Sequence, residues 1–403
     1  MLKPWLSGDY FLYLAMMKNV CRIICVALAS VFLAFSAGAQ AIYTPYPVPS
    51  DSIATVDQAP DGYKVVYVSH FGRHGSRYLL SKYLDAAYDK LDKYDSLKRR
   101  AVLYMYRIHN GNVGKLAPLG AMEQEGIGRR LAQRLPGLFG PDAPIRAKSS
   151  MADRCKKSMQ NFLLGLGQGN KLSLSESSTL PIYMRYSRGI KKHQFKFNND
   201  LNHRIWHYGA DAVCIGLDKD LISRLFTPQE WDALQADGDI YYRNKLFPYS
   251  REEAKIALPL LNEIIFAADA FLKGKRKYVA EFRFGHDSAL VPLAALMGLK
   301  GFCLWRDKAA AVGSLVPMSA NIQLIFYRSD ANPSDVIVKV LHNEVVTSVP
   351  GVRPVLTKNS DPYYKWSELK AYFLGAPQLV QNLTVSSWKG WPQLVQKRGT
   401  CGA

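Results

Sequence analysis

The sequence predicts an α/β protein: an open, largely parallel sheet flanked by helices, with a helical insertion in the middle of the chain. Three observations support this fold class. Short β-branched segments alternate with helix patterns towards both ends of the chain, and the stretch between them is dominated by helix patterns. The 403 residues are 48% hydrophobic, which is enough for a large core.

The first half supplies two strand–turn–helix units. YKVVYV (63–68) predicts a strand that runs directly into the polar stretch SHFGRHGSR. Helical spacing follows at 79–109 and 117–135. PIRAKSS (144–150) predicts a second strand, and a helix begins after it near MADRCKK, with one of the two serines as its N-cap.

The second half repeats the theme after the helical middle section. RKYVAEFRFGHDSALVPLAALMGL (276–299) predicts a third strand, turn and helix. Two further strands are expected at 320–329 and 335–346, the latter folding into a hairpin with its turn near Leu341–Glu344.

The N-terminus has the features of a signal peptide. From Met17, an alternative start, basic residues precede a short apolar run and a small-x-small cleavage site that ends at Ala39. The run is short for a membrane anchor, so we expect a periplasmic or secreted protein without a stable membrane span. The expected parts are a signal peptide (1–39), an extended lead-in (40–60), an α/β core (61–170 and 273–373), a mainly helical insertion that caps the substrate (171–272) and a tail (374–403).

The chain is strongly basic, with a formal net charge of +19. A basic exported protein suits small anionic molecules, anionic lipids or nucleic acid, although the charge can also serve solubility alone. Four cysteines follow the expected cleavage site, without the spacing of a metal site, and their pairing is left open: Cys155, Cys214, Cys303 and Cys401.

Arginine, histidine and aspartate side chains with possible functional roles follow the first three expected strands. Ligands of open α/β sheets bind at the carboxyl ends of the strands, so we expect these side chains to share one pocket. They are Arg73, His74 and Arg77 after the first strand, Arg154 in the first turn after the second, and His286 and Asp287 after the third.

This set of residues suits phosphoryl transfer. Guanidinium groups bind phosphate oxygens in pairs, and a helix N-terminus adds backbone N–H donors. Neighbouring cations lower the pKa of an imidazole and keep it neutral, so that His74 can attack phosphorus. Asp287 can protonate the leaving alcohol and then accept a proton from water. Considered alone, each motif has a structural interpretation. The loop around His74 can be a solvated turn, Arg154 a surface arginine and Asp287 a helix cap.

The same residues carry a family resemblance. RHGSR (73–77) resembles the RHGxR signature of the histidine acid phosphatases, which include phytases and multiple inositol polyphosphate phosphatases. GHDSAL (285–290) is similar to their distal His-Asp motif, and the helix segment around Arg154 to the one that supplies a third arginine. DPYYKWSELKAYF (361–373) is most similar to the inositol polyphosphate phosphatase branch.

The resemblance implies a histidine phosphatase-like fold and a reaction through a phosphohistidine. His74 would be the nucleophile and Asp287 the proton donor, while Arg73, Arg77, Arg154 and His286 would bind the phosphate. It implies no metal and no cofactor. His70 receives no role from it, and we interpret this residue as structural.

Two positions depart from the family pattern. Leu79 stands where many members have a turn-setting proline, which should reduce local rigidity without affecting the chemistry. His286-Asp287-Ser288 stands where the inositol polyphosphate phosphatase branch has His-Ala-Glu, so the branch, and with it the phosphate removed first, is left open.

The leading functional hypothesis is hydrolysis of phosphate from inositol polyphosphates such as phytate. The basic segment RGIKKHQFKF (188–197) would meet further phosphates, unless it is a solvated face. The alternatives are a broad-specificity acid phosphatase, a phosphotransferase that uses the same phosphohistidine, and a non-catalytic binder of polyanions. No nucleic-acid partner is expected, since no recognised module is present.

Overall fold

The fold was analysed in a computed structural model that describes residues 41–169, 200–304 and 310–375. All of these residues belong to one compact unit. The expected signal peptide, the basic segment 188–197 and all but the first two residues of the expected tail lie outside the described residues. Within the described part, no helix combines the length and the apolar character needed to cross a membrane.

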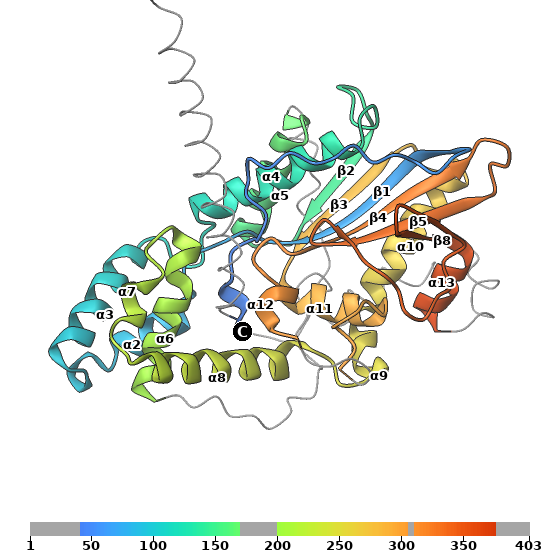
Figure 1. The fold of residues 1–403 in the computed structure, drawn as a ribbon. Helices are drawn as coiled ribbons and strands as arrows, with labels where there is room; N and C mark the ends of the chain where they lie inside the picture. Colours follow the sequence, from blue (N-terminus) through green and yellow to red (C-terminus); the bar gives the residue numbers. More distant parts are fainter. Residues whose placement is uncertain (1–40, 170–199, 305–309, 376–403) are drawn as a thin grey trace, which may run out of the picture. The chain divides into compact units, whose positions relative to one another are not determined.

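A mixed sheet of eight strands forms the centre of the described fold (Figure 1). The strands lie in the order β2-β3-β1-β4-β5-β8-β7, with the short β6 paired to β5. Their bounds are β1 Tyr63–Arg73, β2 Ile145–Ser149, β3 Ala280–Gly285, β4 Asn321–Ser329, β5 Val336–His342, β6 Val345–Val346, β7 Leu356–Lys358 and β8 Asp361–Lys365. The predicted open α/β sheet and its five main strands are thus confirmed, including the hairpin, whose turn is at Asn343–Glu344.

The parallel part of the sheet is smaller than the sequence predicts. Only β2, β3 and β1 run parallel, whereas β4, β5, β8 and β7 pair in antiparallel fashion. Connectivity accounts for the β4–β5 pair, because a short turn joins these two strands and permits only antiparallel pairing.

Helices cover both faces of the sheet, and each face has its own hydrophobic core. Successive side chains of β1 point alternately into these two cores. Val68 and Phe282 pack under α4 (Pro118–Arg134) and α5 (Asp153–Gly165). Tyr67 and Phe71 face the opposite core. The helices on that side, below the sheet in Figure 1, are α10 (Leu258–Leu272), α11 (Asp287–Leu296) and α13 (Trp366–Leu374).

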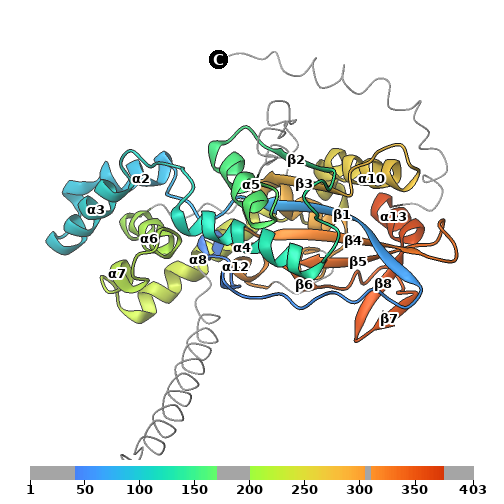
Figure 2. The ribbon, with the colours of Figure 1, turned by 90° about the horizontal axis from the view of Figure 1, so that it is seen from above.

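Helices α2, α3, α6, α7 and α8 form a group beside the sheet (Figure 2), whereas α9 packs on α11. Helix α6, from within the expected insertion, packs against α2 and α3, which precede it by about a hundred residues. Helix α10, also from the expected insertion, packs instead on β1. The bounds are α2 Ser81–Tyr88, α3 Ser96–His109, α6 Leu201–Ala212, α7 Asp220–Ser223, α8 Pro228–Leu246, α9 Arg251–Ala254 and α12 Val312–Leu315. The exact domain boundaries therefore stay a prediction.

The three parallel strands end side by side. Arg73 of β1 is in register with Gly285 of β3, and Ser149 of β2 with Phe284. The three loops that carry the predicted site residues therefore leave the sheet at one edge, as expected for ligand sites in this fold class.

Candidate functional site

The loop after β1 makes an unusually close backbone contact with α4. A Cβ atom on Gly75 would lie 2.4 Å from the carbonyl oxygen of Gly120, so no larger residue fits there. Gly75 is thus required for close packing, and the φ angle at Gly75 is not in the left-handed region. The contact places the backbone of the RHGSR loop directly on a helix.

The imidazole of His74 is buried and its tautomer is set by a backbone contact. Nδ1 lies 2.9 Å from the carbonyl oxygen of Gly75, which can only accept, so Nδ1 carries the proton and Nε2 keeps its lone pair. Burial lowers the pKa of His74 well below its usual value, and the nearby charges of Arg154 and Arg73 lower it further. His74 is therefore a neutral imidazole with a free nucleophilic nitrogen.

His286 links the loops after β2 and β3 to this imidazole. Its ring lies edge-on to that of His74, with 5.4 Å between the ring centroids. Ser150 Oγ is 3.1 Å from His286 Nε2, and Arg154 Nη2 is 3.4 Å from Nδ1. The expectation that one of the two serines caps α5 is wrong, because the N-cap is Ala152, which makes no side-chain cap; Ser150 contacts His286 instead.

Asp287 is the first residue of α11 and pairs with Arg73. Its Oδ2 is 3.1 Å from Arg73 Nη2, and its Oδ1 accepts from the N–H of Ser288. Burial alone would raise the pKa of Asp287, but the charge of Arg73, followed by those of His286 and Lys245, outweighs burial and lowers it. The carboxyl group is thus ionised in the ligand-free site; a bound phosphate would compete for Arg73 and favour its protonated form.

Arg73 and Arg77 are both buried and anchored by backbone carbonyls. Arg73 donates to Val316 O (2.8 Å) and Ile42 O (3.0 Å), and Arg77 donates to Tyr78 O (2.9 Å). The Nε atom of each has no hydrogen-bond partner among the described residues. Both guanidinium groups are held in fixed positions near His74, where burial lowers the pKa of His74 and their charges lower it further.

The structure therefore brings all six predicted site residues together, while their catalytic roles stay predictions. Phosphoryl transfer fits the arrangement, since a neutral imidazole, fixed cations and a carboxyl group converge on one edge of the sheet. His70 lies apart from these six residues. It is buried on the face of β1 that packs against α5, in contact with Phe162 and Phe284, and burial lowers its pKa to about 3. This position agrees with a structural residue.

Three charged residues of the site were missed by the sequence analysis. Glu123 and Asp211 are buried acids that interact, when ionised, with the charges of Arg73 and Arg77, respectively. Lys245 of α8 acts on Asp287. A single acid within an apolar helix stretch, as in HYGADAVCI around Asp211, is a signal that could have pointed to the second of them.

The departure at Leu79 also has a structural use. Its N–H donates to His109 Nδ1 at 3.2 Å, a bond that a proline could not make. His109 therefore carries its proton on Nε2, which lies 3.8 Å from Asp211 Oδ2. The expected loss of rigidity is offset by this contact, because the loop is tied to α3 through a buried ring.

Asp211→Asn is expected to flatten the dependence of stability on pH. Burial raises the pKa of Asp211 to about 8, with Arg77 opposing the rise. Between about pH 4 and 8 the folded protein keeps a proton that the unfolded chain has released, so the free energy of unfolding falls as pH rises, by at most about 1.4 kcal/mol per pH unit. Thermal unfolding from pH 5 to 7.5 measures the slope.

The matched control for this prediction is Asp232→Asn, which neutralises an exposed acid on α8. It should leave the slope of Tm against pH as in the wild type. A slope unchanged in Asp211→Asn would show that Asp211 does not hold a proton in the folded protein.

The other titratable and thiol groups add no further centre. Among residues 41–169, 200–304 and 310–375, no three His, Cys, Asp or Glu side chains gather in a way that could hold a metal ion. Cys155, Cys214 and Cys303 are buried and none of these three is paired with another, while Cys401 lies outside the described residues.

Comparison with known proteins agrees with the resemblance found in the sequence. No family model matches the chain. Multiple inositol polyphosphate phosphatase 1 of Gallus gallus is 24% identical over 320 residues, which cover 65% of this chain and 69% of that protein. The similarity to a histidine acid phosphatase therefore extends well beyond the short motifs.

Solved structures of the same kind of enzyme share the fold. The multiple inositol polyphosphate phosphatase of Bifidobacterium longum, in complex with inositol hexasulfate, superimposes with a TM-score of 0.67 at 19% identity, covering 83% of this chain and 97% of that one. The phytase from D. castellii gives a TM-score of 0.61 at 14% identity, covering 85% and 86%. The histidine phosphatase-like fold predicted from the sequence is thus confirmed.

Proposed function

We propose that this chain is a phosphomonoesterase that releases phosphate from inositol polyphosphates through a phosphohistidine. One observation carries the proposal: His74 presents a neutral, unprotonated Nε2 in the electrostatic field of Arg73, Arg77 and Arg154. The fold shared with phytases and with a multiple inositol polyphosphate phosphatase supports the same conclusion.

The reaction proceeds in two balanced steps. His74 Nε2 forms a bond to phosphorus while the bond from phosphorus to the ester oxygen breaks, and that oxygen leaves as an alcohol with the proton of Asp287. Water then attacks the phosphohistidine; Asp287 accepts its proton, His74 is regenerated and phosphate leaves. The guanidinium groups stabilise the charge on the equatorial oxygens in both steps.

The choice of substrate rests on two further observations. The B. longum enzyme is known in complexes with inositol hexasulfate and with phosphate, which are a highly charged inositol and the reaction product. In this chain, burial alone would lower the pKa of Lys245, but Tyr83, Tyr241 and Asp287 outweigh burial and raise it, so its ammonium group stays charged beside the proton donor. A second phosphate on the leaving group would meet this charge.

We also propose that the chain is exported with cleavage after Ala39, on the sequence features of residues 17–39. One experiment addresses both proposals. The full chain, expressed in a bacterial host, should yield an exported protein whose N-terminal residue is Gln40, and the purified protein should release phosphate from inositol hexakisphosphate.

The product series, resolved by isomer over time, tests the activity and identifies the phosphate removed first. A wild-type protein that releases no phosphate from this substrate but does so from an aryl phosphate would support the broad-specificity alternative. Phosphate transferred to an added alcohol in preference to water would indicate a phosphotransferase. An intact residue 1–39 segment on the exported protein would contradict the cleavage proposal alone.

A further inference from the structure

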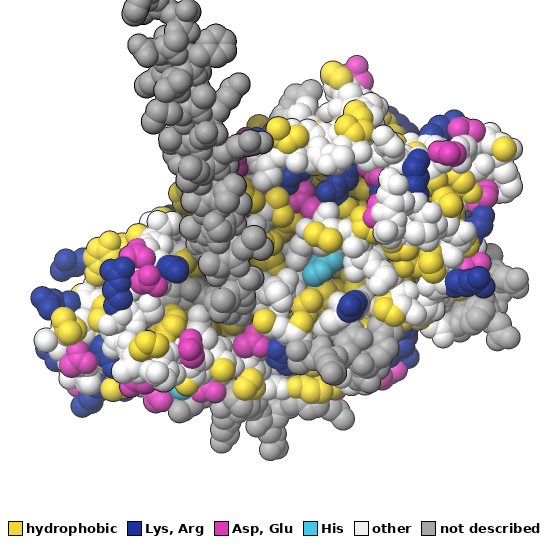
Figure 3. Space-filling view, viewed as in Figure 1, with side chains coloured by type: hydrophobic (Ala, Val, Ile, Leu, Met, Phe, Trp, Pro, Cys, Tyr) yellow, Lys and Arg dark blue, Asp and Glu magenta, His cyan; other side chains and the backbone are white. Residues whose placement is uncertain are grey.

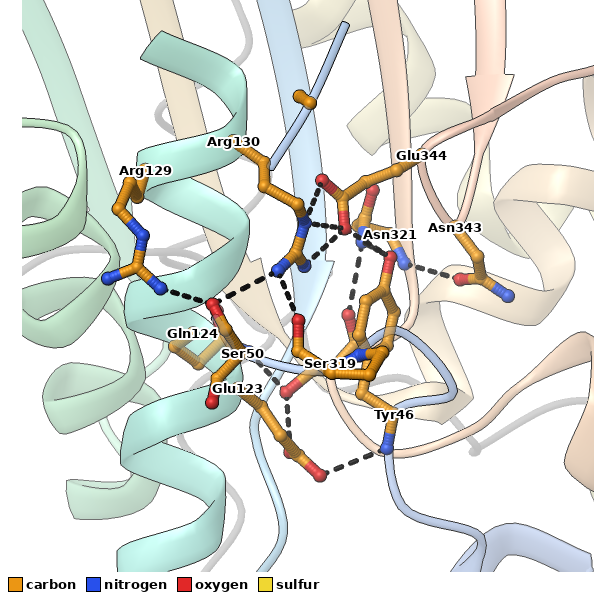
Figure 4. Close-up of polar contacts among 12 residues, drawn as sticks. Tyr46, Ser50, Glu123, Gln124, Arg129, Arg130, Ser319, Asn321, Asn343 and Glu344 are labelled. Carbon is orange, nitrogen blue, oxygen red and sulfur yellow. Dashed lines mark hydrogen bonds and ion pairs between the residues drawn. The ribbon is translucent and has the colours of Figure 1, made fainter. Parts of the chain in front are cut away.

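We infer that Glu123 of α4 is a positioning residue that aims His74 at the phosphoryl group. This inference rests on the proposed function. Among the described residues, no hydrogen bond or ion pair joins Glu123 to His74 itself. Glu123 acts on the backbone that carries the imidazole through four hydrogen bonds, of which Figure 4 draws those from Tyr46 and Ser319.

The four donors to Glu123 come from three separate segments. The N–H and hydroxyl of Ser76, within the RHGSR loop, donate at 2.9 and 2.7 Å. The hydroxyl of Ser319 donates at 2.8 Å and the N–H of Tyr46 at 3.0 Å. The carboxylate is 4% exposed, so water does not compete for these bonds. One buried side chain thus joins the catalytic loop to the segment before β4 and to the lead-in.

Ser319 and Gln124, the neighbour of Glu123 on α4, hold the backbone carbonyls of His74 and of the residue before it. The N–H of Ser319 donates to the carbonyl of His74 at 3.0 Å, and Gln124 Nε2 donates to the carbonyl of Arg73 at 2.9 Å and to Ser319 Oγ at 2.9 Å. Ser319 has a positive φ of 59°, which is costly for a residue with a side chain. Its hydrogen bonds to Glu123 and Gln124 offset that cost and keep the His74 carbonyl in place.

Hydrogen bonds of the Tyr46 side chain hold the lead-in in place. Tyr46 OH donates to Glu344 Oε2 at 2.9 Å, and Arg130 Nη2 lies 2.6 Å from the same oxygen. Asn321 Nδ2 donates to Tyr46 OH at 3.0 Å. Tyr46 is therefore immobilised by its side chain, and its N–H approaches Glu123 from a rigid support (Figure 4).

The pattern of donors requires a carboxylate and disfavours an amide. Each oxygen of Glu123 accepts from one hydroxyl and one backbone N–H. Oε1 accepts from the N–H of Tyr46 and the hydroxyl of Ser76, and Oε2 accepts from the N–H of Ser76 and the hydroxyl of Ser319. A hydroxyl can turn and accept, but a backbone N–H cannot. In either orientation, the NH₂ group of a glutamine would oppose a backbone N–H, so Glu123→Gln must displace the Ser76 loop, the lead-in, or both.

Glu123→Gln is therefore expected to slow formation of the phosphohistidine by about 10- to 100-fold per active site, since small displacements of a reacting group have effects of this size. The measurement is the pre-steady-state burst with an activated aryl phosphate, whose amplitude counts active sites and whose rate reports the chemical step. The matched control is Glu125→Gln, which removes the same charge from a half-exposed residue on the same helix, where the side chain pairs with Arg129. It should react like the wild type.

The burst separates positioning from folding. A purely structural role would lower the amplitude and leave the rate per site equal to that of Glu125→Gln, and this result would overturn the inference. If Glu123→Gln does not fold, Ser319→Ala removes one of the four donors and should reduce the rate by about 3- to 10-fold; an unchanged rate would again overturn it. A wild-type protein that releases phosphate neither from the aryl phosphate nor from inositol hexakisphosphate would instead contradict the proposed function.

Discussion

Replacing His74 by alanine is expected to lower kcat for phosphomonoester hydrolysis by at least about 10⁴-fold, because the variant has no nucleophile to form the covalent intermediate. The fixed cations would still bind phosphate, so the loss should fall on kcat and leave the affinity for inorganic phosphate within a few-fold of the wild type. Steady-state rates, phosphate binding and acid-quench trapping of the phosphohistidine measure the three quantities.

The matched control for this prediction is His70→Leu. His70 lies on β1, the strand that leads into His74, and leucine has a similar volume and suits its aromatic surroundings. This variant should retain kcat within a few-fold and should still form the phosphohistidine. If His74→Ala kept wild-type turnover, the phosphohistidine mechanism would be wrong; if His70→Leu lost activity while remaining folded, His70 would belong to the catalytic machinery.

Asp287→Asn is expected to have an effect that depends on the leaving group. Departure of an inositol hydroxyl requires a proton, so loss of the acid should reduce kcat for inositol hexakisphosphate by about 10²- to 10⁴-fold. An activated aryl phosphate has a leaving group that needs little protonation, and its first step should fall at least ~10-fold less. Asparagine keeps one oxygen that can accept from Arg73, but its NH₂ group then opposes the N–H of Ser288, so the difference between the two substrates, and not either loss alone, reports the proton transfer.

The second step gives an independent readout for Asp287. With the base removed, water should attack the phosphohistidine more slowly, so Asp287→Asn should accumulate the intermediate during turnover of the aryl phosphate. Equal losses on both substrates, without accumulation, would contradict its assignment as proton donor and leave it the role of orienting Arg73.

The six predicted site residues were accessible to sequence analysis for a local reason. Each lies within a few residues of a strand end, and β-branched strands are recognisable from short stretches of sequence. Parallel strands then bring their carboxyl ends to one edge of the sheet, so adjacency in space follows from the fold class. His74, Arg154 and Asp287 could thus be assigned to one pocket before any contact was known.

The supporting residues were not accessible, because their contacts are distant in sequence. Glu123 meets Ser76 across 47 residues and Ser319 across 196, and nothing in their local patterns specifies that pairing. Asp211 and Lys245 come from helices whose position is set by packing against the rest of the fold. A buried acid in a helix looks the same in sequence whether it faces an arginine or water.

By itself, therefore, the sequence determined the chemical class of the site and the edge of the sheet where it lies. It did so because short motifs encode both the side chains and the strand ends that present them. The tertiary structure alone decided which nitrogen of His74 is free, which carboxylates offset the crowded cations, and which helix holds the loop. The carboxylates and the helix are set by distances of about 3 Å between segments that only the packed core brings together. The tautomer of His74 is set by the local conformation of the packed loop, which places its Nδ1 against the carbonyl oxygen of Gly75.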